Sequence, residues 1–469
     1  MPAMSSSTLH MDVEGGKCMR LMARIKAVVC IYLAMTLILT SVGGGLAVAD
    51  ESDGKYIVIY LEGIDLNLQK LLLTPLGVEV VHVLSLINAL AIKIPLGIIG
   101  SVLQILLNDP NVEGVFDDPV GSADYTVSIE PTDPPPEELY PWGLDRIHIP
   151  EVHAQLAEAT GSGVTVAVLD TGIDRSHPEL NPQGSPRIVD CFNALPGGGS
   201  CDDDNGHGTH VAGIIAANSN LQGVIGAAPL IKLAAIKVLS SDGAGHISDC
   251  INGLQRVYTK RYPLVNMSLG FPEDNVPLQR AIARLYQRGT IMVASVGNTN
   301  PRPSAAGEGS DGEGSDTTCD PEAAGEGSDG EGSDSETSCY RTTNIKYPAA
   351  YPTVIGVGAT DIEDRVTNYS RIGDAVDLVA PGGSKETGRI LSTNRGGGYG
   401  EGSGTSQAAA HVTGAVALVM QRQALQGRPA LTFSQMLALL QNTAVDLGEP
   451  SEFQGAGLLD VGSLMNALQ

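Results

Sequence analysis

Three polar residues stand at the edges of apolar segments and together could carry out acyl transfer. Asp170 ends the apolar run Val164 to Leu169, His207 opens an apolar helical segment, and Ser406 leads the apolar run that follows Gly404-Thr405. An acid that orients an imidazole, a base and a hydroxyl nucleophile are the parts of covalent acyl transfer. Each residue alone has a commoner structural role, such as a helix cap or a turn residue. The three together favour catalysis.

The surroundings of Ser406 suit a developing negative charge. The backbone N–H groups at a helix N-terminus are unpaired and the helix dipole favours negative charge there, which suits a nucleophile beside an oxyanion. Asn298 follows the strand-like segment Ile291 to Gly297, and in isolation it is plausible as an ordinary turn residue after glycine.

Alternating strands and helices from Tyr140 onward place these residues. Strands are predicted at Val164 to Leu169, Ile231 to Leu239, Leu264 to Met267, Thr290 to Ser295, Thr353 to Val357 and Val376 to Val379. Helices are predicted at 207–218, 246–260, 276–288, 406–420 and 432–443. This alternation predicts an α/β fold with a doubly wound, mostly parallel sheet. Its functional sites lie outside the carboxyl ends of the strands, where the polar segments fall.

A smaller unit precedes this pattern. Strands at Tyr56 to Tyr60, Val78 to Val83, Ala89 to Ile94 and Val112 to Phe116 alternate with helices at Leu66 to Leu73 and Ile98 to Leu107. The order β-α-β-β-α-β predicts a ferredoxin-like α+β fold. The segment 122–138 is rich in proline and acids, which predicts an exposed, extended linker that is easily cut.

The N-terminus and the cysteines indicate export. Basic residues precede an apolar run from Ala27 to Val42, and Ala47-Val48-Ala49 is a small-residue cleavage site, so residues 1–49 are predicted to be a signal peptide rather than a membrane anchor. Cys191 and Cys201 flank a Gly-rich loop and are predicted to form a disulfide; Cys319 and Cys339 are a second candidate pair. Cys250 lies on an apolar helical stripe and is predicted to be a buried free thiol.

Charge excludes one class of partner. The 469-residue chain carries a formal net charge of −25, with 53 acids against 28 basic residues. This balance argues against nucleic acid as a partner. We expect a soluble, exported monomer without stable membrane association.

Three sequence blocks carry a resemblance to a known family. Residues 170–174 read DTGID, residues 205–213 NGHGTHVAG and residues 404–414 GTSQAAAHVTG. In this order they resemble the signature blocks of subtilisin-like serine proteases, the subtilase family, over residues 140–469. The resemblance implies a serine endopeptidase acting on polypeptides through an acyl-enzyme. Ser406 would be the nucleophile, His207 the base, Asp170 the orienting acid and Asn298 the oxyanion donor.

The resemblance also implies how substrate binds and how the enzyme is made. Ser268, Leu269 and Gly270 match the strand on which the family binds extended peptides. Residues 50–136 resemble the family's propeptide, a folding chaperone and inhibitor, cut somewhere between Asp117 and Pro136 to leave a catalytic domain at 137–469. A retained binding domain is the alternative. Calcium is implied, with ligands that match Glu179, Asn218, Asn220, Gln222 and Val224, although the family usually has Asp where Glu179 stands.

Other positions depart from the family. Gln407, Ala410 and Phe271 stand where the family has Met, Pro and Gly, and Phe271 bears on the shape of the substrate cleft. Between Asn298 and Tyr347, the same twelve-residue acidic tract occurs at 305–316 and at 323–334, which predicts a disordered insertion at 303–339. We expect an exported, calcium-assisted endopeptidase made as a zymogen. The rivals are an inactive homologue that serves as a binding protein and a processing protease with a narrow substrate.

Overall fold

The computed structural model describes residues 54–124, 129–156, 158, 160–182, 185–299 and 344–469. The predicted signal peptide, the pair Cys319 and Cys339 and the acidic insertion lie outside these residues. Internal contacts divide the chain into two units. One contains the chain up to Val81 together with Asn88–Asp117, and the other contains His82–Ile87 and Asp118–Gln469.

The first unit has the predicted element order. Its elements are β1 (Lys55–Tyr60), α2 (Leu66–Leu73), β2 (Glu79–Leu84), β3 (Ala89–Lys93), α3 (Ile99–Asn108) and β4 (Val112–Asp117), and the short 3-10 turns η1 (Thr74–Leu76) and η2 (Leu96–Ile98) precede β2 and α3. β2 continues past Val81 into residues that the contacts group with the second unit. The sheet order is β2-β3-β1-β4, and β1 pairs antiparallel with both β3 and β4. Asp65 starts α2 because its carboxylate accepts the N–H groups of Asn67 and Leu68.

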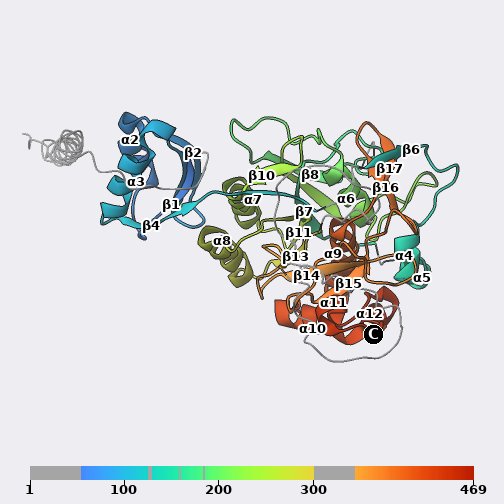
Figure 1. Cartoon of the computed structure of the whole chain (residues 1–469). Coiled ribbons are helices and arrows are strands. Elements are labelled where there is room, and N and C mark those ends of the chain that lie inside the picture. Colours follow the sequence, from blue (N-terminus) through green and yellow to red (C-terminus); the bar gives the residue numbers. More distant parts are fainter. Residues whose placement is uncertain (1–53, 125–128, 157, 159, 183–184, 300–343) are drawn as a thin grey trace, which may run out of the picture. The chain divides into compact units, whose positions relative to one another are not determined.

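The second unit is built on a seven-stranded parallel sheet in the order β15-β14-β13-β11-β7-β9-β8 (Figure 1). The strands are β7 (Thr165–Asp170), β8 (Ile188–Asn193), β9 (Lys232–Lys237), β11 (Leu264–Met267), β13 (Ile291–Ser295), β14 (Ile355–Thr360) and β15 (Leu378–Pro381). All pairs are parallel. The predicted doubly wound sheet is confirmed. β9 and β8 lie on one side of β7, and β11, β13, β14 and β15 lie on the other. The strand order therefore reverses between β7 and β11, where a site is expected.

Helices cover the sheet. Helix α6 (His207–Ala216) packs against α9 (Thr405–Leu425), and α9 contacts β11, β13, β14 and β15 (Figure 1). Helices α7 (Ile247–Lys260) and α8 (Val276–Gln287) pack against each other; α7 contacts β7 and β8, and α8 contacts β13. Small residues let α9 approach closely, since a Cβ on Gly414 would lie 2.4 Å from that of Ala227. The core is therefore an Ala- and Val-rich layer between α9 and the sheet.

The remaining elements surround this core. The helices are α4 (Trp142–Arg146), α5 (Ile149–Gln155), α10 (Phe433–Thr443), α11 (Ser451–Gln454) and α12 (Val461–Asn466). Two small sheets have the orders β10-β5-β12 and β16-β17-β6, with β5 (Val120–Ala123), β6 (Glu130–Thr132), β10 (Ala244–His246), β12 (Leu269–Gly270), β16 (Ile390–Asn394) and β17 (Gly398–Gly402). No helix in the described residues has the length and apolar character that a membrane crossing requires.

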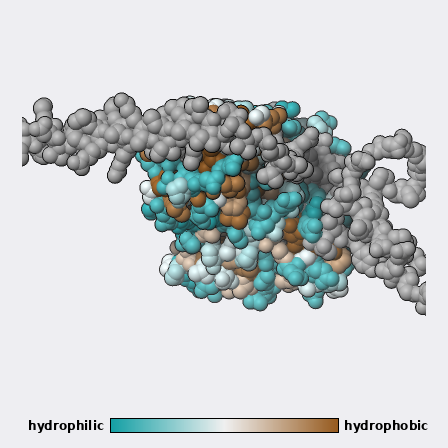
Figure 2. Space-filling view, turned by 60° about the vertical axis from the view of Figure 1, so that its left-hand side comes forward, coloured by the Kyte–Doolittle hydropathy of each residue, from teal (hydrophilic) through white to brown (hydrophobic). Residues whose placement is uncertain are grey.

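The prediction of an exposed linker over 122–138 is wrong at its N-terminal end. Ala123 and Asp124 are buried, and β5 and β6 both pair with strands of the second unit. The physical reason is that β10 and β12 each have an edge whose backbone N–H and C=O groups need hydrogen-bond partners, and β5 pairs with both edges. Contacts group the chain from Asp118 onward with the second unit, which differs from the predicted boundary at 136. Figure 2 shows one face of the molecule, on which most coloured residues are hydrophilic and the hydrophobic ones lie in small groups among them.

Candidate active site

Asp170 and His207 form a fully buried pair at the carboxyl end of β7. The Nδ1 atom of His207 lies 2.7 Å from Asp170 Oδ1, and both side chains are shielded from solvent. Because a carboxylate only accepts, Nδ1 carries the proton and Nε2 is left as the basic nitrogen. The close approach needs a glycine beside His207, since a Cβ on Gly208 would lie 2.1 Å from the Gly172 carbonyl oxygen and 3.1 Å from the Asp170 side chain.

The pair sets the basicity of His207. Burial alone disfavours the imidazolium, but the charge and hydrogen bond of Asp170 outweigh it, so the pKa of His207 is raised above its usual value. The neighbouring His210 lacks such a partner, and burial together with the charge of His207 lowers its pKa to about 3. Of these two buried histidines, His207 is therefore the one suited to accept a proton.

Asp203 holds the loop that presents His207, and sequence reasoning missed it. Its Oδ1 accepts the Thr171 hydroxyl at 2.8 Å and the N–H groups of Asn205 and Gly206. Its Oδ2 accepts the N–H and hydroxyl of Thr209 at 2.9 and 2.6 Å. One carboxylate thus joins the segment after β7 to the first turn of α6. The run of three aspartates before Asn205 was the available signal for such a turn.

Ser406 and Asn298 meet at the N-terminus of α9. The Oδ1 atom of Asn298 accepts the N–H and the hydroxyl of Thr405 at 3.1 and 2.9 Å, which fixes the amide next to Ser406. The Nδ2 atom of Asn298 is buried without a hydrogen-bond partner among the described residues. The Ser406 hydroxyl donates to the Ser268 carbonyl at 3.1 Å. A buried amide with an unused donor beside a helix N-terminus is suited to receive an oxyanion.

Part of the same chain lies in this site as an added strand. β5 pairs antiparallel with β12, Leu269 opposite Ala123 and Gly270 opposite Ser122, and with β10 on its other edge. The Asp124 N–H continues the pairing by donating to the Ser268 carbonyl at 3.3 Å. The Ser406 N–H donates to the Asp124 carbonyl oxygen at 3.2 Å. The structure thus brings Ser268, Leu269 and Gly270 onto an extended peptide whose last carbonyl faces Ser406.

The three departures from the family pattern fit into the core. Gln407 and Ala410 are buried in α9, and Gln407 Nε2 lies 3.4 Å from His210 Nδ1. Phe271 is fully buried and exchanges backbone hydrogen bonds with Tyr347. Its ring lies against β5, since a Cβ on Gly121 would be 2.4 Å from it. The Phe271 ring therefore narrows the substrate cleft beside Gly121, three residues before Asp124.

The predicted calcium ligands lie together but bind each other. Buried Glu179 accepts the Tyr399 hydroxyl at 2.8 Å on Oε1 and the Asn220 amide at 3.0 Å on Oε2. Burial raises the pKa of Glu179. Nearby, Glu138 accepts the N–H groups of Asn220 and Leu221. Hydroxyl and amide donors therefore occupy the carboxylate that a cation would need.

This donor set does not fit calcium as it stands. Calcium takes six to eight oxygen ligands, with anionic oxygens turned toward the ion. Asn218, Gln222 and Val224, whose carbonyls the resemblance implied, belong to the same loop as Asn220, but no metal role follows for them here.

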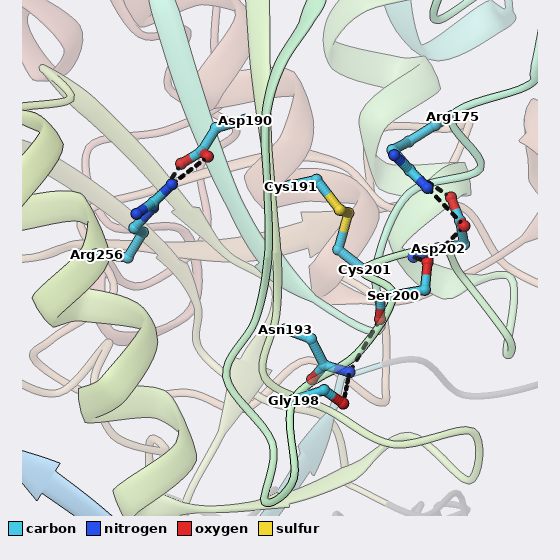
Figure 3. Close-up of a disulfide and its surroundings, with 9 residues drawn as sticks. All are labelled: Arg175, Asp190, Cys191, Asn193, Gly198, Ser200, Cys201, Asp202 and Arg256. Carbon is cyan, nitrogen blue, oxygen red and sulfur yellow. Dashed lines mark hydrogen bonds and ion pairs between the residues drawn. A yellow bond between two sulfur atoms is a disulfide. The ribbon is translucent and has the colours of Figure 1, made fainter.

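A disulfide braces the loop before His207 (Figure 3). Cys191, in β8, is bonded to Cys201, as predicted, with Cα atoms 5.4 Å apart; Cys250 is free and buried, also as predicted. Within the closed loop, Asn193 donates to the carbonyls of Gly198 and Ser200. The Cys201 carbonyl accepts the Ile173 N–H at 3.3 Å, so the disulfide-linked loop rests on the segment that follows Asp170.

Ion pairs flank this disulfide (Figure 3). Arg175 donates to both oxygens of Asp202, and this pairing lowers the pKa of Asp202 to about 2. On the other side Arg256 donates to both oxygens of Asp190, next to Cys191. The loop that carries His207 is therefore tied to the sheet by a covalent bond and by charge.

Comparison with known proteins agrees with this geometry. The model of the family described as the subtilase family matches residues 161–457. The chain is 32% identical over 440 residues to subtilisin NAT of Bacillus subtilis subsp. natto and to subtilisin E of Bacillus subtilis strain 168, which covers 92% of this chain and 97% of each relative. It is 37% identical over 320 residues to subtilisin Savinase of Lederbergia lenta, which covers 68% of this chain and 96% of the relative.

Proposed function

The chain belongs to the subtilase family and is a serine endopeptidase, and from that premise we propose that it is an exported zymogen that cuts its own chain between Asp124 and Tyr125. Residues 1–49 direct export, and the segment up to Asp124 is the propeptide. Polypeptides are the substrates, and the tail of the propeptide inhibits the enzyme until it leaves the cleft.

One observation carries this proposal. The Asp124 carbonyl oxygen accepts the Ser406 N–H at 3.2 Å, at the end of a strand added to β12. A peptide carbonyl held by a donor at the N-terminus of α9, next to a serine hydroxyl, is in the place of the bond to be cut. An inactive homologue that serves as a binding protein would not need the unused amide donor of Asn298 beside it.

In the proposed mechanism Ser406 attacks the carbonyl carbon. Its hydroxyl first turns from the Ser268 carbonyl toward His207 Nε2, which takes the proton as the new C–O bond forms. Asp170 holds the imidazole in the required tautomer and stabilises the imidazolium. The Ser406 N–H and Asn298 Nδ2 bind the oxyanion.

The second half of the reaction returns the enzyme to its starting state. His207 gives its proton to the leaving nitrogen, the C–N bond breaks and Ser406 carries the acyl group. His207 then takes a proton from water as the water attacks the ester. Collapse of the second oxyanion releases the acid, and the proton returns to Ser406. No metal takes part in these steps, and we propose no calcium at the Glu179 loop.

The test uses the full-length precursor with and without Ser406→Ala. The wild type is expected to appear as a shortened chain beginning at Tyr125 and to degrade a denatured protein, whereas Ser406→Ala stays full length and inactive. Ser241→Ala, a change at an exposed serine, is the matched control and is expected to behave as wild type. A wild type as uncut and inactive as Ser406→Ala overturns the proposal.

A further inference from the structure

The side chain of Asp124 lies in a charged subsite that the proposed mechanism does not use. Asp124 is 1% exposed, its Oδ1 accepts Lys346 Nζ at 2.8 Å and its Oδ2 accepts the Ser295 hydroxyl at 2.7 Å. Both oxygens of the carboxylate therefore have a donor from the walls of the site. This is the residue whose carbonyl meets Ser406, so its side chain fills the subsite next to the scissile bond.

The walls of this subsite are shaped for the lysine. Ser295 ends β13, and the stem of Lys346 passes between the backbones of Gly270 and Gly297. A Cβ on Gly270 would lie 2.5 Å from Lys346 Cδ, and one on Gly297 would lie 2.9 Å from it. Gly297 also has a positive φ of 99°, which favours glycine. Side chains at either position would displace the lysine from the subsite.

The charge of the subsite suits an acid. Within the described residues, Asp124 is the one carboxylate that pairs with Lys346, whose side chain is 15% exposed. A second cation borders the same wall: Arg371 Cδ lies 3.0 Å from where a Cβ of Gly297 would be, and Arg371 donates to the Asn298 carbonyl. A largely buried ammonium without a counter-charge is unfavourable, so the subsite favours an anionic side chain.

We propose that this enzyme selects peptide bonds on the carboxyl side of aspartate, with Lys346 and Ser295 as the residues that determine this specificity. The inference rests on the proposed function and adds its substrate class. A carboxylate at this position binds both donors, an amide loses the ion pair, and a lysine or arginine meets a like charge. Glutamate carries an extra methylene into a subsite already filled by Asp124, so it is expected to react more slowly than aspartate.

The direct test measures kcat/KM on a matched set of peptides. Each has the sequence of residues 120–126, Val-Gly-Ser-Ala-Asp-Tyr-Thr, with Asp unchanged or replaced by Asn, Glu or Lys, and the products are identified by mass spectrometry. The processed wild-type enzyme is expected to prefer Asp over Asn by on the order of a hundredfold and to leave the Lys peptide almost uncut. A digest of a denatured protein is expected to show cuts mainly after aspartate.

Variants at Lys346 assign the preference to the subsite. Lys346→Met keeps the length of the stem and removes the charge, so the preference for Asp over Asn should fall to within a few-fold. Lys346→Arg should keep a preference for Asp. Lys232→Met, an exposed lysine at the amino end of β9, is the matched control and should keep the wild-type ratio. Titration of the active serine with a sulfonyl fluoride counts the folded sites in each preparation.

The outcomes separate the two proposals. A wild type that cuts the denatured protein but treats the Asp and Asn peptides within threefold overturns the specificity and leaves the endopeptidase standing. An unchanged preference in Lys346→Met also overturns it. A wild type that cuts nothing, like Ser406→Ala, overturns the proposed function itself. If Lys346→Met yields no titratable sites, the wild-type ratio of Asp to Asn decides.

Discussion

The two strands that flank residues 125–128 are held in different ways. The acyl-side strand, β5 with Asp124, pairs along both edges and ends in a side chain that is 1% exposed between Lys346 and Ser295. The leaving-side strand, β6, pairs along one edge with β17. Its charged contact is an ion pair between Arg389, whose side chain is 9% exposed, and Glu130, whose side chain is 61% exposed.

This difference indicates which side of the scissile bond discriminates between substrates. Buried, fully paired contacts before the scissile bond discriminate between side chains, because a wrong group leaves a donor or charge without a partner. An ion pair whose carboxylate is mostly exposed contributes less, since water and salt screen that charge. The comparison therefore predicts strict requirements on the acyl side and tolerance on the leaving side, with the new N-terminus released easily.

The largest effect is expected from Asp170→Asn. The amide fixes the wrong imidazole tautomer, so kcat on the Asp peptide should fall by about 10⁴-fold, the size known for this change in serine proteases. Because a variant this slow does not process itself, tagged wild-type enzyme first removes its propeptide and is then withdrawn; the rate on the Asp peptide is compared with that of Lys232→Met, an exposed lysine at the amino end of β9. A loss smaller than tenfold contradicts the role of Asp170.

The same variant has a pH signature. His207 must be neutral to take the Ser406 proton, so kcat/KM rises with pH through the pKa of His207. The charge of Asp170 outweighs burial and raises that pKa, so the acidic limb of the wild type should lie above pH 6.5, the ordinary value for histidine. In Asp170→Asn the burial remains without the charge, and the limb should move to lower pH. A limb that stays in place contradicts this account.

The next largest effect is expected at Asn298, the proposed oxyanion donor. Asn298→Leu keeps the volume and removes Nδ2, so kcat should fall by about 10²- to 10³-fold while KM changes little, because the oxyanion exists only in the transition state. Kinetics on the Asp peptide measure both constants. A variant that raises KM and leaves kcat unchanged shows that Asn298 only binds substrate.

The sequence pointed to the proposed catalytic triad more directly than to the residues around it. Asp170, His207 and Ser406 each follow or open an apolar run, and the short blocks around them are recognisable without a structure. The run Leu264–Met267 was predicted to the residue, because a strand buried on both faces is mostly apolar, although this one includes the buried Asn266. Helix α9 was predicted from its start, but its end at Leu425 was not, since the polar residues Gln421, Arg422 and Gln423 interrupt the apolar run there.

The missed parts depend on partners far away in the chain. β16 and β17 are rich in glycine and polar residues, and each is a strand because the other pairs with it. β5 and β6 lie in a segment whose composition is that of a linker, and only the open edges of β12 and β17 make them strands. Lys346 is one of ten lysines in the sequence, and nothing in the residues next to it marks it as part of a site. Its proposed role follows from its ion pair with Asp124, which lies 222 positions away in the sequence.

A change in the middle of the acyl-side strand should have an intermediate effect. A Cβ at Gly121 would lie 2.4 Å from the Phe271 ring and 2.7 Å from the Gly270 carbonyl oxygen. Gly121→Val in the precursor should therefore slow processing at Asp124 by on the order of tenfold or more, measured by pulse-labelling and gel analysis. The double variant Gly121→Val with Phe271→Ala should recover part of the rate. Equal rates in wild type and Gly121→Val contradict the close packing.

The smallest effect is expected on the leaving side, where Glu130→Gln removes the charge from β6. The Glu130 side chain is 61% exposed while that of Arg389 is 9% exposed, so water and salt screen the charge that is removed; processing should stay within about threefold of wild type and become less sensitive to salt. The isosteric partner experiment is Asp124→Asn, where the same loss of one charge falls on a buried residue and should slow processing by on the order of a hundredfold. Comparable processing rates for the two precursors would show that burial of Asp124 does not make the acyl side more demanding than the leaving side. A slower Glu130→Gln would place recognition after the scissile bond.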